Sequence, residues 1–153
     1  LAEVRIDKLD EALKAFDRAT TLNPGSHEAW NYKGFVLEDL GRLKDAISSF
    51  DRAIKVNPNF IAALNNKGLV LDKRGKHGEA IEAYNSAIQA NPAFDAAWFN
   101  MACAYSLLGE KDNMLDSLKK ALDLNHRYKM GLQQVPDFLR YRNDPEFLKL
   151  SGR

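Results

Sequence analysis

The chain has 153 residues, of which 45% are hydrophobic and 28% are charged, and its formal net charge is +1. That length fits one domain, and the balance between apolar and charged residues is that of an ordinary globular protein rather than a disordered one. The small net charge, without a cluster of Lys and Arg, argues against a nucleic-acid partner.

No stretch of the chain approaches the about 20 apolar residues that a membrane-spanning helix requires, and the first residues do not form a basic-then-apolar leader. We therefore expect a soluble, cytoplasmic protein that does not bind a membrane. Cys103 is the only cysteine, so no disulfide can form within the chain.

Helical periodicity starts with the first residues. Leu1 to Ile6 is expected to be the end of one helix and Leu9 to Leu22 a second helix, with apolar residues on one side and charged residues on the other. Asn23-Pro24 ends the second helix, because proline cannot donate the helix hydrogen bond and disfavours the α conformation of the residue before it. The chain starts in the middle of a helix and lacks an initiator methionine, so we expect it to be a fragment of a longer protein.

A two-helix pattern then recurs at a spacing of 34 residues, marked by Asn-Pro at Asn23-Pro24, Asn57-Pro58 and Asn91-Pro92, with Asn125-His126 as a degraded instance. Glycine separates the two helices of each unit, because it can take the left-handed conformation that ends many helices. The expected helices are His27 to Leu40, Leu43 to Val56, Ile61 to Arg74, Gly78 to Ala90, Asp95 to Leu108 and Lys111 to Leu124.

Six columns are apolar or small when the units are numbered from His27, Ile61 and Asp95. They are position 4 (Trp30, Leu64, Trp98), position 8 (Gly34, Gly68, Ala102), position 11 (Leu37, Leu71, Tyr105), position 20 (Ala46, Ala80, Met114), position 24 (Phe50, Tyr84, Leu118) and position 27 (Ala53, Ala87, Ala121). Ala12, Phe16 and Ala19 continue the last three columns upstream. This pattern resembles the tetratricopeptide repeat (TPR) family, with its W-x₂-L-G-x₂-Y…A-x₃-F…P motif.

The resemblance covers roughly Leu1 to Tyr128 and implies an all-α, right-handed solenoid of antiparallel helix pairs. It divides the chain into a partial repeat (1–26), three repeats (27–60, 61–94 and 95–128) and a C-terminal capping segment (129–153). The chain departs from the family pattern where Lys33, Lys67 and Met101 replace Leu, and where Met114 and His126 replace Ala and Pro.

The period stops after Asn125. Arg127 to Gln134 is expected to form a further helix, and Pro136 and Pro145 to open two short helical turns, the second with Asp144 as its N-cap. Repeat arrays need a terminal cap whose outer face tolerates water. We interpret the tail as this cap, with five apolar residues over the last repeat: Phe138, Leu139, Phe147, Leu148 and Leu150.

The sequence offers no pattern of catalytic, metal-binding or cofactor-binding residues. His27, His77 and His126 stand at three unrelated repeat positions, and no glycine-rich phosphate loop is present. Cys103 is expected to be a small buried or groove-lining thiol, and Trp30 and Trp98 to pack between helices. We predict a protein that is not an enzyme and needs no cofactor.

The candidate binding residues come from the resemblance. In the family, the first helix of each unit lines a concave groove with positions 2, 5, 6, 9, 12 and 13, and extended peptides lie there. Carried over, these positions are Glu28, Asn31, Tyr32, Phe35, Glu38 and Asp39 in the first unit; Ala62, Asn65, Asn66, Leu69, Asp72 and Lys73 in the second; and Ala96, Phe99, Asn100, Cys103, Ser106 and Leu107 in the third.

Asn66 and Asn100 share position 6 of consecutive units, and an asparagine amide both donates and accepts hydrogen bonds. The two side chains either grip a peptide backbone or are simply tolerated on an exposed helix face, and both interpretations stay open. The chaperone-binding subclass of the family holds a terminal carboxylate with Lys, Arg and Asn at set positions. Only Asn66 fits that pattern, so the basic residues for such a partner are missing.

The candidate groove carries four acidic residues against one basic residue, Lys73, which predicts a partner with Lys or Arg at one end and an apolar anchor at the other. The predicted function is a non-enzymatic protein-interaction module. The alternatives are the targeting arm of a larger enzyme, such as a glycosyltransferase, or a self-assembling scaffold. Because Leu9, Leu13 and Phe16 lack a full partner helix upstream, we also expect a homodimer through this N-terminal open edge.

Overall fold

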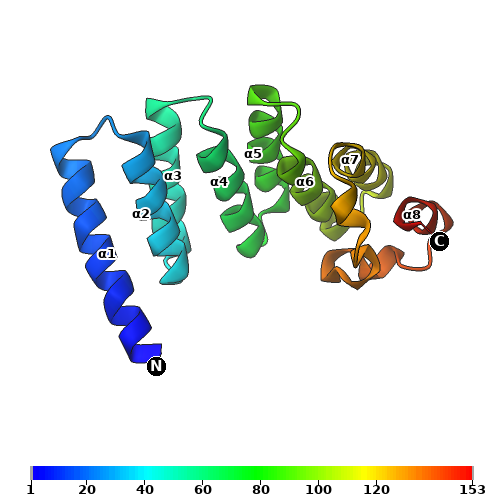
Figure 1. The fold of residues 1–153 in the computed structure, drawn as a ribbon, viewed down its shortest axis with the longest axis horizontal. Coiled ribbons are helices and arrows are strands. Elements are labelled where there is room, and N and C mark those ends of the chain that lie inside the picture. The colour runs from blue at the N-terminus through cyan, green and yellow to red at the C-terminus, as the bar shows by residue number, and fades with distance from the viewer. Residues whose placement is uncertain (1, 153) are drawn as a thin grey trace.

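The computed structural model describes residues 2–152, with side chains from Arg5 onward, and forms an arch of successive helix pairs (Figure 1). Within these residues no strand occurs, which confirms the all-α prediction. The α-helices are α1 (Ala2–Leu22), α2 (His27–Asp39), α3 (Leu43–Val56), α4 (Ile61–Lys73), α5 (His77–Ala90), α6 (Asp95–Leu108), α7 (Lys111–Leu124) and α8 (Pro145–Ser151), and three short 3₁₀ helices lie between α7 and α8: η1 (His126–Lys129), η2 (Leu132–Gln134) and η3 (Pro136–Tyr141).

Each repeat is a hairpin of two helices closed by a glycine in the left-handed conformation. Gly41, Gly75 and Gly109 have φ angles of 74°, 72° and 80°. A side chain at these angles would strain the backbone, so glycine is the residue that allows the turn. The predicted boundaries of α2 to α7 therefore agree with the structure to within a residue.

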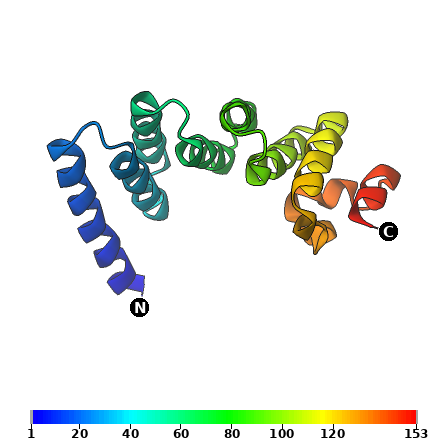
Figure 2. The ribbon, with the colours of Figure 1, turned by 45° about the horizontal axis from the view of Figure 1, so that its top comes forward.

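The N-terminal prediction was wrong in one respect: α1 is a single helix through the expected break between Ile6 and Leu9. Asp7 occupies the repeat position of Gly41, Gly75 and Gly109, and without glycine the left-handed turn is unfavourable. The first turns of α1 consequently project beyond the end of α2, as both ribbon views show (Figures 1 and 2).

The helices of a hairpin approach closely because position 8 is small. A Cβ atom placed on Gly34 would lie 2.5 Å from the ring of Phe50, and one on Gly68 would lie 2.3 Å from the ring of Tyr84. Both rings are completely buried. Positions 20, 24 and 27 of α3, α5 and α7 are also completely buried, so the columns identified in the sequence form the core of each hairpin.

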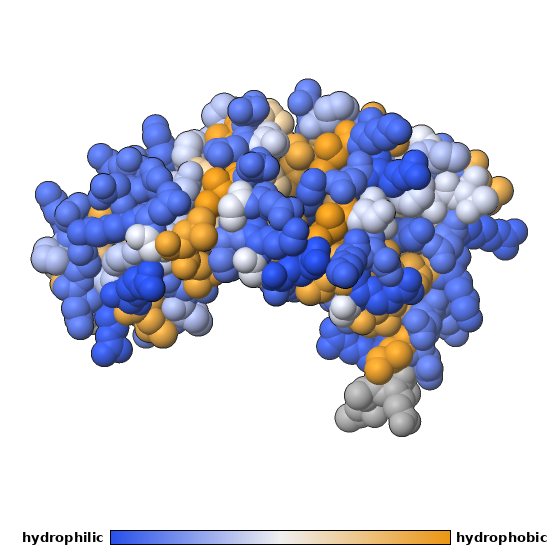
Figure 3. Space-filling view, turned by 180° about the vertical axis from the view of Figure 1, so that it is seen from behind, coloured by the Kyte–Doolittle hydropathy of each residue, from blue (hydrophilic) through white to orange (hydrophobic). Residues whose placement is uncertain are grey.

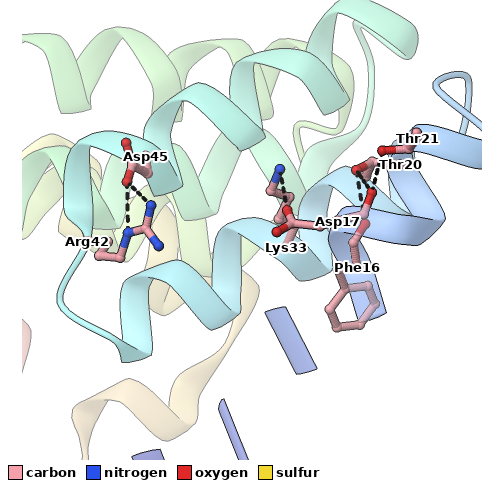
Figure 4. Close-up of polar contacts among 7 residues, drawn as sticks. All are labelled: Phe16, Asp17, Thr20, Thr21, Lys33, Arg42 and Asp45. Atoms are coloured by element: carbon pink, nitrogen blue, oxygen red, sulfur yellow. Dashed lines mark hydrogen bonds and ion pairs between the residues drawn. The ribbon is translucent and has the colours of Figure 1, made fainter. Parts of the chain in front are cut away.

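Consecutive repeats meet at interfaces that we call seams: the first between α1 and the α2–α3 hairpin, the second between that hairpin and α4–α5, and the third between α4–α5 and α6–α7. In the first two seams, the lysine at position 7 forms an ion pair with the aspartate at position 25 of the preceding repeat. The distance from Nζ to Oδ1 is 2.8 Å for Lys33 and Asp17 (Figure 4) and 2.7 Å for Lys67 and Asp51. These pairs explain why lysine replaces the family's leucine there. The third seam has Met101 and Asn85 at the same positions and cannot form the pair.

The tail folds back against α6 and α7. Phe138 and Phe147 are completely buried and pack with Met114, Leu118 and Leu122, so the tail covers apolar side chains of α7. Asp144 is the predicted N-cap of α8 and accepts hydrogen bonds from the backbone N–H groups of Glu146 and Phe147.

Two details of the tail differ from the prediction. Arg127 to Gln134 does not form one helix, because Gly131 takes the left-handed conformation (φ 76°) between η1 and η2. Leu139 is 49% exposed and does not contribute to the cover, since Phe138 already fills the space against α6.

Candidate functional site

The candidate site is the inner side of the arch, which α2, α4 and α6 line while α3, α5 and α7 lie along the outer side (Figure 2). These are the helices on which the sequence placed its candidate residues. Seen from behind, the surface is largely hydrophilic, and its apolar side chains gather in narrow bands rather than one broad patch (Figure 3). The site is therefore best described helix by helix.

Asparagine pairs join the three inner helices. Asn66 Nδ2 donates to Asn31 Oδ1 at 3.2 Å, linking α4 to α2, and Asn100 Nδ2 donates to Asn65 Oδ1 at 3.0 Å, linking α6 to α4. Position 5 of one repeat thus binds position 6 of the next. The sequence analysis considered Asn66 and Asn100 as ligand-binding or merely tolerated residues, and it missed this contact with the neighbouring repeat.

The pairs leave part of each amide available. An asparagine side chain has two N–H donors and a carbonyl with two lone pairs, whereas each pair uses one donor and one acceptor. No fully enclosed side-chain nitrogen or oxygen among the described residues lacks a hydrogen-bond partner. Asn31, Asn65 and Asn66 are only 5–8% exposed, so the unused donors and acceptors of these amides reach the inner surface over a small area.

Aromatic side chains are accessible on α2. Tyr32 is 54% exposed and Phe35 is 43% exposed. Phe16 stacks on Tyr32 with ring centroids 5.8 Å apart, and Phe35 meets the edge of the buried Phe50 ring at 6.1 Å. Each accessible ring is therefore held in place on one side and open on the other, an arrangement that suits an apolar anchor of a ligand.

Two of the acidic candidates are engaged within the protein. Glu38 forms an ion pair with Lys73 across the second seam. Asp72 accepts a hydrogen bond from Tyr84 Oη at 2.7 Å and lies 2.8 Å from His77 Nδ1. Burial raises the pKa of Asp72 above its ordinary value, although the hydrogen bonds from His77 and Tyr84 act in the opposite direction.

The other acidic candidates, Glu28 and Asp39, lie at the two ends of α2 and are exposed. Glu28 Oε1 is 3.3 Å from His27 Nε2. The negative charge that a ligand can reach is thus concentrated on α2, beside Tyr32 and Phe35.

The third repeat is covered by the tail. Phe99 stacks on Tyr128 with centroids 4.4 Å apart and meets the edge of Phe138 at 5.8 Å. Ser106 Oγ donates to the backbone carbonyl of Asp137 at 2.5 Å. Cys103 lies in the same apolar cluster. Three of the candidate residues on α6, namely Phe99, Cys103 and Ser106, are therefore covered by the chain's own η1 and η3.

Cys103 is a weakly reactive thiol in this environment. Burial, with the negative charge of Asp137 nearby, raises the pKa of Cys103 above its ordinary value, which keeps the group protonated at neutral pH. Within residues 2–152, no cluster of His, Cys, Asp and Glu could hold a metal ion.

The remaining candidates vary in accessibility. Ala62, Lys73 and Leu107 are exposed, whereas Leu69 and Ala96 are half-buried. The sequence analysis did not place Tyr128, Asp137 or Phe138 at the inner face. Tyr128 is the last residue of the third repeat and the other two lie beyond it, so no repeated column predicts where these side chains pack.

A row of helix hairpins stacked in one direction, with polar and aromatic side chains along its inner face, defines the class: a helical-repeat protein-interaction module. Tetratricopeptide repeat profiles match residues 1–59, 36–96 and 95–127, and the chain belongs to the tetratricopeptide repeat family. No curated protein matches it. Among the described helices, none is long and apolar enough to cross a membrane.

Solved structures of repeat proteins share the fold. A MamA structure is 30% identical with a TM-score of 0.73, over 80% of this chain and 67% of that one. MamA from Desulfovibrio magneticus RS-1, residue 41 to the end, is 23% identical with a TM-score of 0.80, over 96% of this chain and 84% of that one. YrrB, described as a TPR protein with an unusual peptide-binding site, is 18% identical with a TM-score of 0.74, over 96% and 76%.

Proposed function

We propose that the chain is a non-enzymatic module that binds an extended segment of a partner protein across α2 and α4. The observation that carries the proposal is the pair of accessible aromatic side chains, Tyr32 and Phe35, beside amide groups with unused hydrogen-bonding capacity. Backbone contacts to asparagine and a side-chain anchor on an aromatic ring are the two elements that peptide recognition needs. The peptide-binding site named for YrrB, a protein of similar fold, supports this interpretation.

The site spans two repeats rather than three. The tail occupies the inner face of α6 through Phe138 and the carbonyl of Asp137, so a ligand anchored at Phe99 and Cys103 would have to displace it. The apolar anchor of the ligand therefore belongs on α2, where Tyr32 and Phe35 are exposed.

The charge of the accessible face favours a ligand with a basic residue next to its apolar anchor. Glu28 and Asp39 are exposed on α2, whereas Glu38 is already paired with Lys73. Lys or Arg near these carboxylates speeds encounter and selects against acidic partners more than it adds affinity. An acidic C-terminal tail should bind poorly for the same reason.

The test is a titration of labelled peptides, one set basic and apolar and one set acidic and apolar, followed by fluorescence anisotropy at low and moderate salt. Phe35→Ala is expected to weaken binding of the basic set by about tenfold or more, as loss of a central aromatic anchor does. Val56→Ala is the control, since Val56 on α3 is exposed to a similar degree (41%). Asp39→Lys should also weaken binding, whereas Glu82→Lys on α5 should not.

Preference for the acidic set would contradict the charge argument. Binding that is unaffected by both Phe35→Ala and Asp39→Lys would contradict the location of the site. Asn66→Ala is a less specific test, because it also leaves the buried Asn31 without its partner and so perturbs the second seam.

A further inference from the structure

One side of α1 departs from the repeat pattern, because it has no hairpin partner within residues 2–152. In the other repeats the equivalent side of the second helix packs on the first helix. Ala12, Phe16 and Ala19 stand at positions 20, 24 and 27 of a repeat, and all three are only half-buried. Their nine equivalents have no exposed surface at all: Ala46, Phe50, Ala53, Ala80, Tyr84, Ala87, Met114, Leu118 and Ala121. In α3, α5 and α7 these positions are covered by the first helix of the same hairpin, and no described element covers them fully in α1 (Figure 1).

The course of α1 argues against cover by a hairpin partner directly preceding it. Such a partner needs a left-handed turn at Asp7, and the helix continues straight through that residue. The first helices of the other repeats cannot serve either, because Gly34 and Gly68 already hold the rings of Phe50 and Tyr84. A helix from a second molecule can approach this side of α1 without such a turn.

The open side of α1 is complementary to itself. Ala12, Ala15 and Ala19 follow one another at spacings of three and four residues, so they lie along this side of α1, and the larger Phe16 and Leu22 lie beside them. Leu22 is 77% exposed. Close approach of two helices requires small residues on one to receive large residues on the other, as Gly34 receives Phe50. Two copies of α1 can satisfy this in both directions at once.

The flanking charges match as well. Glu11 and Arg18 are both exposed and, being seven residues or about two helical turns apart, lie on the same flank of α1. A two-fold axis beside Ala15, midway between them, brings Glu11 of each copy opposite Arg18 of the other. Two ion pairs then form across an apolar centre.

We propose that the open side of α1 binds the same side of a second copy, with the two α1 helices antiparallel. A single helix pair buries less than the about 800 Å² per partner of a standard interface, so the dimer is weak and depends on concentration and salt. The proposal does not rest on the peptide site on α2 and α4, although Phe16 on the open side of α1 also stacks on Tyr32.

Sedimentation over a wide range of concentration tests it with charge reversals on the chain of 153 residues. Glu11→Arg and Arg18→Glu should each weaken dimerisation by about tenfold or more, because both pairs become repulsive at once. An equimolar mixture of the two variants should restore the dimer, since the arginine introduced at position 11 of one variant then faces the glutamate introduced at position 18 of the other. Glu82→Arg on α5 makes the same charge change away from α1 and should have no effect.

Restoration in the mixture supports the antiparallel pairing specifically, because a nonspecific effect of either substitution would not cancel. A wild-type chain that stays monomeric at every concentration overturns the proposal. So does a dimer that neither reversal weakens, or a mixture that dimerises no better than the single variants. Circular dichroism of each variant checks that the exposed substitutions leave the fold intact.

Discussion

Replacing Gly68 by alanine tests the close packing of α4 against α5. A Cβ atom at this position would lie 2.3 Å from Tyr84 Cε1, whereas ordinary contact begins at 3.4 Å. The ring would have to move by about an ångström, and it is fully buried with its hydroxyl bound to Asp72. Overpacking of this kind costs about 1–3 kcal/mol, and alanine in place of a helical glycine regains about 1 kcal/mol, so we expect a net loss of up to about 2 kcal/mol.

The loss should appear as a lower urea midpoint followed by far-UV circular dichroism. Gly78→Ala is the matched control, because a Cβ there meets no atom within 4 Å; it should stabilise the protein by up to about 1 kcal/mol. The third repeat has Ala102 opposite Leu118, so Gly68→Ala should be tolerated in a Tyr84→Leu background. Equal midpoints for Gly68→Ala and Gly78→Ala, or an equal loss in the Tyr84→Leu background, would refute the reasoning.

Three further outcomes follow from side-chain contacts. Asp51→Asn should lower the free energy of unfolding by no more than about 1 kcal/mol at low salt and by less at high salt, because the ion pair with Lys67 is partly exposed; an effect that grows with salt would contradict this. Phe138→Ala should detach the tail and lower the free energy of unfolding by about 3–5 kcal/mol. Cys103 should then react faster with a thiol reagent. Unchanged reactivity would mean that Phe138 does not hold the tail over Cys103. The raised pKa of Asp72 means that the folded state binds this proton more tightly than the unfolded state does, so the contribution of Asp72 to stability should fall as pH rises from its ordinary pKa to the raised one. Asp72→Asn should remove that contribution from the pH dependence of urea unfolding. An Asp72 pKa at or below its ordinary value, measured by NMR titration, would contradict the prediction.

The regular part of the fold could be predicted because each column has one physical role. Gly41 and its equivalents are needed for the left-handed turn, and Gly34 and Gly68 for the close approach of an aromatic ring. The N-terminal prediction failed where a column departs from this rule: Asp7 stands in the glycine column, and the expected hairpin turn is replaced by a continuous helix.

The contacts that shape the candidate site were harder to predict, because they join different columns. The partner of Asn66 is Asn31, which is one position out of register, so an alignment of equivalent residues does not show the pair. A signal was present in the asparagines at position 5 and at position 6 of the following repeat. No such signal exists for Phe138, whose position over Phe99 depends on the path of a tail outside the repeat.

The seams between repeats are held together in different ways. The second seam has polar contacts at both edges. The hydrogen bond between Asn31 and Asn66 lies on its inner side, and the ion pair between Asp51 and Lys67 lies on the other side of α4. The third seam has Asn65–Asn100 on its inner side only, and Met101 and Asn85 leave its other edge without an ion pair. The third seam is held instead by apolar packing, because Ala97, Met101 and Ala104 of α6 lie in one buried cluster with Tyr84 and Ala87 of α5. A ligand lying across α2 and α4 would therefore span the seam whose register is fixed by polar contacts at both edges.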